Sequence, residues 1–321
     1  MAKQSIAEAN TLYVQRTPFQ KFCIDFVKNW QLHLLMIIPV VYIVLFEYLP
    51  MFGLQIAFRD YTPKAGIIGS QWVGLGKFQQ FFNDRNWTLY LWNTFRISFY
   101  SIIAGFPVPI ILALIIHVNE NKTLKKVVQN VSYVPHFFSV IVLVGILNRI
   151  FDPWTGLIKT AYTLMGQATA PNLLQDPGAF DHMYVWSGVW QGMGWGAIIY
   201  LSSLSSVSPE LHEAARIDGA SRWKRVLHVD LPAILPMISI QLILRMGSVI
   251  SVGYEKIYLM QNNFNTYKST VISLYVYKKG LGEDMSFGAA VGLMNAVVNT
   301  SMVVFVNWIA NTLSDGEAGL F

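Results

Sequence analysis

The chain has 321 residues, of which 54% are hydrophobic and only 13% are charged, and its formal net charge is +5. Typical globular proteins carry about 25% charged residues, so the composition excludes an ordinary soluble domain, a disordered chain and a coiled coil. The single cysteine, Cys23, cannot form an internal disulfide. We expect an integral membrane protein whose positive charge lies in loops beside an anionic bilayer, and no binding of nucleic acid.

The first 31 residues carry aromatic side chains at helical spacing, with charged residues between them. Phe19, Phe22, Phe26 and Trp30 form this aromatic series. The pattern is typical of an amphipathic helix on the inner membrane surface, although an ordinary helix packed on the protein fits it as well. We expect residues 1–31 to form a cytoplasmic N-terminal segment without a cleavable signal peptide.

Six stretches of the chain are long and apolar enough to cross a bilayer, which takes about 20 residues. They are Leu32–Phe52, Trp92–Val118, Val131–Phe151, Met183–Ser206, Ala233–Gly253 and Ser286–Ala310. The sequence therefore predicts an all-α, polytopic membrane protein with six transmembrane helices. These occupy one domain, residues 32–310, followed by a tail at residues 311–321.

The distribution of lysine and arginine bears on the orientation of these spans. With both termini in the cytoplasm, the inner segments hold 11 Lys and Arg residues and the outer loops hold 9. This difference is small, but the short inner loop with Lys122, Lys125 and Lys126 also obeys the positive-inside rule. Cytoplasmic termini are the orientation that the charges favour.

Residues 207–236, between the fourth and fifth spans, combine several helix-boundary signals. Ser208 is a suitable N-cap, Pro209 fits the first helical turn, and Glu210 suits the positive end of the helix dipole. Gly219 can end this helix in a conformation that other residues resist. A basic segment, Arg222–Arg225, begins a second short helix. We predict a helix–turn–helix elbow at the membrane surface.

The elbow also carries a motif. Glu213-Ala-Ala, Asp218-Gly-Ala220 and a later Leu-Pro232 with Pro236 stand at the spacing of the EAA loop, and the elbow resembles that loop of permease subunits in bacterial ABC importers. The stretch Tyr48–Tyr61, with Trp72–Leu75 after it, is similar to maltose- and polysaccharide-type sugar permeases. The chain is identified as a member of this branch, with the permease of an alginate importer as one candidate.

The resemblance implies a type I ABC importer permease fold in the bacterial inner membrane. The elbow would form cytoplasmic coupling helices, which fixes both termini in the cytoplasm. Partners would be a second homologous permease subunit, two ATPase subunits that bind ATP and Mg, an extracytoplasmic solute-binding protein and a saccharide. The residues expected to couple to the ATPase are Glu213, Ala214, Ala215, Asp218, Gly219, Ala220, Pro232 and Pro236.

A substrate route is expected near Arg245, which lies about 20 Å along the fifth span from Pro232. A mid-membrane arginine costs roughly 2.5–3.5 kcal/mol on insertion scales, so it should face the protein interior. An anionic saccharide and an ion pair with a partner subunit both fit it. By resemblance to maltose-type permeases, the other route residues are Gln191, Gly192, Trp195, Met246, Val249, Ile250 and Gly253, with Tyr254 adjacent.

The chain lacks a Gly-x-x-x-x-Gly-Lys-Ser/Thr phosphate loop, so it has no ATP site of its own. No Cys/His ligand spacing predicts a metal or cofactor, and the six histidines, among them His117 and His136, are scattered. Two alternatives stay open. A membrane-embedded glycan-processing enzyme would need clustered catalytic polar residues, and a stand-alone channel or carrier would leave the EAA loop without a purpose.

Overall fold

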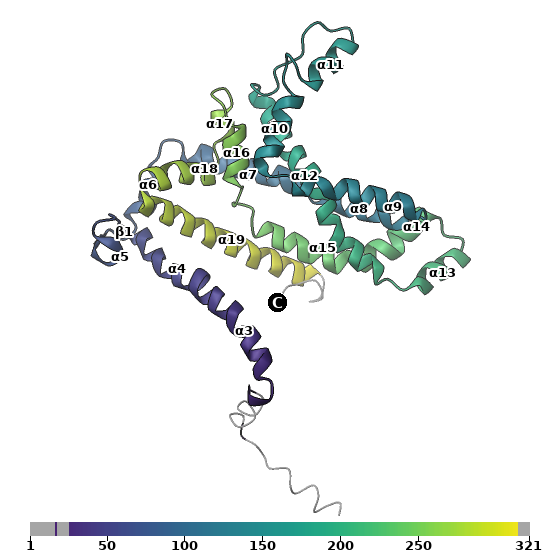
Figure 1. Ribbon diagram of the computed structural model, residues 1–321, viewed down its shortest axis with the longest axis horizontal. Coiled ribbons are helices and arrows are strands. Elements are labelled where there is room, and N and C mark those ends of the chain that lie inside the picture. Colours follow the sequence, from purple (N-terminus) through teal and green to yellow (C-terminus); the bar gives the residue numbers. More distant parts are fainter. Residues whose placement is uncertain (1–16, 18–25, 314–321) are drawn as a thin grey trace, which may run out of the picture. The chain divides into compact units, whose positions relative to one another are not determined.

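The computed structural model describes Thr17 and residues 26–313 (Figure 1). Contacts within the chain divide it into two units, residues 1–55 and 56–321. The described residues are mainly helical. Their one sheet is a two-stranded antiparallel ribbon of β1 (Arg59–Asp60) and β2 (Gln71–Trp72). The predicted all-α class is confirmed.

The first unit contains α3 (Trp30–Ile43), the π-helical turn η1 (Val44–Tyr48) and α4 (Leu49–Met51), and η2 (Phe52–Phe58) crosses its boundary. Together they form an apolar helical segment, Trp30–Phe58, that is long enough to cross a membrane. No residue of α3 is buried within its own unit. The first predicted span is confirmed, whereas most of the predicted surface helix in residues 1–31 lies outside the described residues.

The second unit begins with the ribbon and two short helices, α5 (Gly66–Gly69) and α6 (Gly76–Phe82). The second span follows as α7 (Trp87–Gly105) and α8 (Pro107–Val118), which together make one apolar segment of 32 residues. Pro107 opens α8. Its missing N–H costs little there, because the N–H groups in the first turn of a helix have no acceptor within that helix. The predicted span is confirmed and begins five residues earlier, at Trp87.

The third predicted span is not one helix. Its residues belong to α9 (Lys122–Tyr133), η3 (Val134–Phe137) and α10 (Val140–Ile150), and the segments before and after the break are bent by 104°. Ser139 caps α10 by accepting the N–H of Val142, and Gln191 donates its amide to the carbonyl of Phe138. The prediction of a continuous helix over Val131–Phe151 is wrong because these side chains satisfy the broken backbone.

The fourth predicted span lies in α12 (Pro177–Ser205), a helix of 29 residues that follows α11 (Leu157–Leu164) and packs against α7 and α8. Polar residues such as Asp181 and Gln191 lower its hydropathy. The described residues contain four helices apolar and long enough to span, or five if the bent pair of segments is one span, and α12 is not among them. The predicted count of six spans is therefore not reached by composition and length.

The fifth span follows the elbow, which consists of α13 (Pro209–Ile217), α14 (Arg222–Arg225) and the π-helical turn η4 (Val226–Asp230). Its helix α15 (Leu231–Met246) ends seven residues before the predicted Gly253. Asn299 accepts the N–H of Ile250 at 3.2 Å and donates to Ser251 Oγ at 2.7 Å. Irregular backbone is tolerated at membrane depth where protein groups satisfy it, and Asn299 does so here.

The remaining elements are α16 (Tyr254–Met260), α17 (Thr266–Ser269), α18 (Ile272–Val276), η5 (Tyr277–Leu281) and α19 (Met285–Leu313). Helix α19 confirms the sixth predicted span and lies beside α15 (Figure 1). The two approach closely just after α15, where a Cβ on Gly247 would lie 2.3 Å from a methyl carbon of Val303. Glycine at this position therefore permits the contact.

Candidate functional site: the elbow, its base and the intramembrane cavity

The tip of the elbow is built by local backbone chemistry. Ser208 Oγ accepts the N–H of Glu210 at 3.3 Å, which caps the start of α13. At the other end, Ala220 N–H donates to Ala215 O at 2.9 Å and Gly219 N–H donates to Arg216 O at 3.0 Å. These two bonds are a Schellman motif, and Gly219 has the positive φ of +75° that the motif requires. The predicted cap and stop of this helix are confirmed.

The expected coupling residues lie on an accessible surface. Glu213, Ala214, Asp218 and Gly219 are exposed, and Ala215 and Ala220 are half-buried. Large apolar side chains surround them in the same elbow, namely Leu211, Trp223 and Ile217, which is 87% exposed. Exposed apolar groups around a carboxylate are typical of a protein-docking surface. Pro232 and Pro236 are exposed on the first turns of α15.

The elbow is tied to the loop between α8 and α9 by Glu120. One carboxylate oxygen of Glu120 lies 3.0 Å from Arg222 Nη2, and the other lies 4.0 Å from Arg216 Nη2. All three side chains are well exposed, and exposed pairs contribute up to about 1 kcal/mol each. This pair of contacts orients the elbow more than it stabilises the fold.

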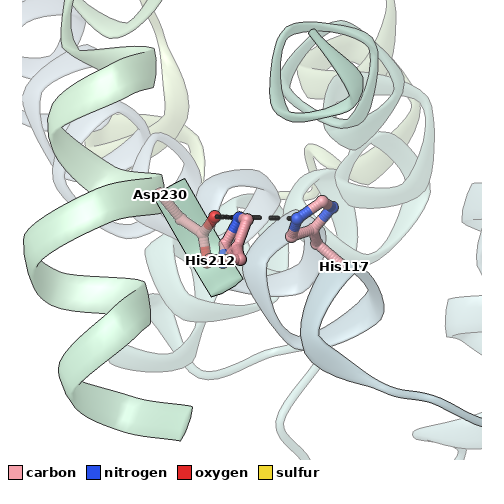
Figure 2. A group of neighbouring side chains, drawn as sticks. All are labelled: His117, His212 and Asp230. Carbon is pink, nitrogen blue, oxygen red and sulfur yellow. Dashed lines mark ion pairs between the residues drawn. The ribbon is translucent and has the colours of Figure 1, made fainter. Parts of the chain in front are cut away.

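A buried carboxylate stands at the base of the elbow. Asp230, the last residue of η4, is 1% exposed, and its Oδ1 lies 3.1 Å from His212 Nε2 and 3.6 Å from His117 Nε2. His117 comes from the last turn of α8 and His212 from α13, and both rings point at the carboxylate (Figure 2). We call these three residues the His–Asp cluster. The histidines that look scattered along the sequence are thus partly gathered by the fold.

Two of the expected route residues, Trp195 and Arg245, line one cavity between the helices, together with Gln241 and Tyr200. The Arg245 guanidinium lies against Gly105, where a Cβ would be 3.0 Å from Nη2. Among the residues that the structure describes, Arg245 forms no ion pair within 4 Å. The cavity therefore combines an indole, two polar groups and a cation that no described residue neutralises through an ion pair.

Trp195 and Gln191, both on α12, have further partners. Trp195 stacks on His136 with ring centroids 4.6 Å apart and planes 5° apart. Gln191 uses its amide N–H on Phe138 O, so its donor is engaged with the backbone of the third span. Gly192 faces open space, since a Cβ there would meet no atom within 4 Å.

The other expected route residues lie at or after the end of α15. Met246 is its last residue, whereas Val249 and Ile250 are each 3% exposed in the core around Phe81 and Phe287. Gly253 faces open space, and the ring of Tyr254 stacks on Tyr277 at 4.3 Å. The structure thus brings Trp195 and Arg245 together but buries Val249 and Ile250. The part that each residue plays in transport stays a prediction.

Lys256 is a polar group that sequence reasoning missed. Its ammonium donates to Tyr184 O at 2.8 Å and lies 4.7 Å from the centroid of the Tyr184 ring. Burial lowers the pKa of Lys256 to about 8. A single lysine in a short helix looks like a solvated residue. The one sequence signal for a buried lysine here was its position just after the expected route residues Gly253 and Tyr254.

These features define a class: an all-α membrane protein with an exposed helical elbow and an intramembrane cavity that contains an arginine. Residues 105–315 match the family described as binding-protein-dependent transport system inner membrane component, and the chain belongs to that family. It is accordingly an ABC transporter permease of the inner membrane, a transport subunit and not an enzyme.

Proteins of similar sequence and structure support the same family. Protein LplB of Bacillus subtilis (strain 168) is 38% identical over 292 residues, 90% of this chain and 91% of LplB. The polygalacturonan/rhamnogalacturonan transport system permease protein YteP of the same organism is 35% identical over 321 residues, 98% of this chain and 99% of YteP. A chain of a bacterial ABC transporter involved in the import of the acidic polysaccharide alginate superimposes with a TM-score of 0.83 at 32% identity, over 92% of this chain and 99% of its own.

A further crystal structure shows a bacterial alginate ABC transporter in complex with an alginate pentasaccharide-bound periplasmic protein. One of its chains matches with a TM-score of 0.82 and 32% identity, covering 91% of this chain and 98% of that chain. The match over nearly all of both chains confirms the permease fold expected from the sequence. The enzyme alternative has no support, because YteP, similar over its whole length, is named as a transport permease.

Proposed function

We propose that this chain is the permease subunit of an ATP-driven importer of oligo- or polysaccharides that receives its substrate from an extracytoplasmic binding protein. The names of YteP and of the alginate transporters support a carbohydrate substrate. A second homologous permease subunit would complete the membrane pathway. Two ATPase subunits, which bind ATP and Mg, would drive alternating access.

The observation that carries this proposal is the exposed elbow. Glu213 and Ile217 project from a helix whose end is fixed by a Schellman motif, and Glu120 ties the elbow to the end of α8. A rigid, exposed helix with apolar and acidic side chains suits docking into a groove of the ATPase. This role requires the elbow and both termini to be cytoplasmic.

The cavity at Arg245 and Trp195 supports an acidic saccharide. Aromatic rings offer an apolar face on which a sugar ring can stack, and a guanidinium binds carboxylates well. Arg245 has no ion-pair partner among the described residues of this chain, so a uronic-acid carboxylate could provide the compensating charge. An ion pair with the partner permease is the competing role for the same side chain.

The coupling role is tested by replacing Glu213 with Ala in the complex reconstituted in liposomes with its ATPase and loaded binding protein. We expect saccharide-stimulated ATP hydrolysis to fall about tenfold or more, which corresponds to about 1.4 kcal/mol of lost coupling. The basal hydrolysis by the ATPase should change little because its catalytic groups lie in another chain.

Glu283→Ala is the matched control, because Glu283 is also an exposed carboxylate and lies in the loop before α19. It should keep wild-type stimulation. Full stimulation in the Glu213→Ala complex, with the subunits still assembled, would contradict the coupling role and would favour a permease driven through other contacts.

A further inference from the structure

The structure assigns a metal site to the His–Asp cluster: we propose that His117, His212 and Asp230 bind one divalent transition-metal ion, with Zn²⁺ as the expected ion. The inference does not depend on the substrate or on the coupling role proposed above. It concerns the base of the elbow, where three separate elements of the fold meet (Figure 2).

The spacing of the three donor atoms fits a tetrahedral ion. Zinc binds imidazole nitrogen and carboxylate oxygen at about 2.0–2.2 Å, so two tetrahedral ligands lie roughly 3.3–3.6 Å apart. Asp230 Oδ1 is 3.1 Å from His212 Nε2 and 3.6 Å from His117 Nε2, and one ligand atom from each of the three residues lies within 4.8 Å of the other two. The two separations that involve Asp230 lie within about 0.2 Å of this range, and the two imidazole nitrogens would have to approach each other by at most about 1.5 Å to complete the coordination.

Two of the three donor atoms have no hydrogen-bond partner among the described residues. Asp230 is 99% buried, yet its Oδ1 accepts no hydrogen bond from the part of the chain that the structure describes, and His212 Nε2 is likewise buried without one. The two atoms face each other at 3.1 Å but are not aligned as donor and acceptor. Buried polar atoms are normally satisfied, and an unpartnered carboxylate oxygen is especially costly. A metal ion would satisfy both atoms at once.

The donor set selects among metals. Two imidazoles and one carboxylate suit zinc and its neighbours in the transition series, whereas Ca²⁺ and Mg²⁺ prefer ligand sets made of oxygen. Three protein ligands leave a fourth position for water, and the cluster borders a cavity lined by polar residues that can admit it.

Cationic side chains also line this cavity, and most are directed at other acceptors. Arg216 and Arg222 approach Glu120, and Lys125 donates to the backbone carbonyl of His117 at 2.8 Å. Arg225 is the remaining cation, and in the described part of the chain it forms no ion pair with Asp230. Among the described residues, the ion-pair contacts of the Asp230 carboxylate are therefore those with the two imidazoles.

A bound ion would join the end of α8 to both arms of the elbow. His117 belongs to α8, His212 to α13 and Asp230 to η4, directly before α15. The metal would therefore hold the elbow rigid against the second and fifth spans, and amide exchange in α13 should slow when it binds.

The test uses the full-length chain in its complex with its partner subunits, stripped with a chelator and titrated with Zn²⁺. Bound zinc is counted by mass spectrometry after gel filtration, and affinity is measured against a chromophoric chelator. His212→Gln and Asp230→Asn should each lower the affinity of one site per chain at least about 100-fold. Groups that merely orient a ligand already cost 10–100-fold when removed.

His228→Gln is the matched control, because His228 is exposed on the same π-helical turn and its Nδ1 faces Lys224 O instead of the cluster. It should bind zinc as wild type does. If Asp230→Asn fails to assemble, His212→Gln and the visible spectrum of Co²⁺ in the wild-type complex still decide. Equal zinc binding by wild type and His212→Gln, or a Co²⁺ spectrum without four-coordinate bands, would overturn the proposal.

Discussion

Gly219 shows how one residue positions the surface of the elbow. Its φ of +75° allows Ala220 to bond back to Ala215, which ends α13 and turns the chain toward α14. A side chain in this left-handed conformation costs about 1–2 kcal/mol, although a Cβ at Gly219 would meet no atom within 4 Å. The strain of a substitution is therefore conformational and not steric.

Gly219→Ala should weaken the Schellman bonds by this amount and speed hydrogen exchange of the Gly219 and Ala220 amides about 5–30-fold. Exchange mass spectrometry on the purified complex measures it. Gly282→Ala is the control, because Gly282 has a φ of −83° and equally open surroundings, so its amides should exchange as before. An unchanged rate at the elbow in Gly219→Ala would contradict the assigned backbone role.

At the scale of elements, Lys77 joins α6 to the start of α19. Its ammonium lies 2.9 Å from Asp284 and 2.6 Å from Asp60. Burial alone would raise the pKa of Asp284, but the hydrogen bond and charge of Lys77, together with the backbone N–H groups of Phe287 and Ser286, outweigh it and hold that pKa below its ordinary value of 3.8. Burial likewise opposes the charge of Lys77, and its two carboxylate partners raise its pKa above 10.5.

These directions set a pH window for the contact. A carboxyl with a depressed folded pKa adds stability above its ordinary value, and this is lost as the pH falls through the lower folded value. An ammonium with a raised pKa adds stability that is lost as the pH rises through its higher folded value. The contact should stabilise the protein fully between about pH 4 and pH 10.5.

Asp284→Asn should therefore lower the thermal unfolding midpoint at pH 7, and the difference from wild type should shrink on acidification below pH 4. Scans of the purified complex across pH measure it. Asp60→Asn is the comparison, and its effect should be smaller because the Asp60 side chain is 58% exposed and that of Asp284 is 22% exposed. A difference for Asp284→Asn that does not depend on pH would refute the ionic origin.

At the scale of the whole molecule, we expect the cavity at Arg245 to select among saccharide substrates. The loaded binding protein should stimulate ATP hydrolysis of the reconstituted complex more with uronic-acid oligomers than with neutral ones. Arg245→Gln should cut transport of the acidic oligomers at least about tenfold, since hydrogen bonds to charged groups contribute about 1.5–3 kcal/mol. Uptake into liposomes measures this directly.

Arg149→Gln is the control for that experiment, because Arg149 lies in the last turn of α10 and donates to Thr155 at 3.3 Å. It should transport as wild type does. Stimulation by neutral oligomers alone would exclude an acidic substrate. Loss of assembly in Arg245→Gln would instead point to the ion pair with a partner permease.

Local chemistry made much of this protein predictable. The apolar composition predicted the membrane class, and Ser208, Pro209 and Gly219 predicted where α13 begins and ends, because caps and positive φ depend on neighbouring residues. The motif around Glu213 led to the permease family that residues 105–315 confirm. These features need no information about the rest of the fold.

The tertiary structure decided what depends on distant partners. The third span breaks where Gln191 binds Phe138 O, and the backbone after Met246 leaves the helix where Asn299 binds Ile250 N–H. A hydropathy pattern cannot predict these hydrogen bonds, because the donor and the acceptor lie far apart along the chain. His117, His212 and Asp230 likewise come from three elements, and only the packing of α8, α13 and η4 turns scattered histidines into one candidate site.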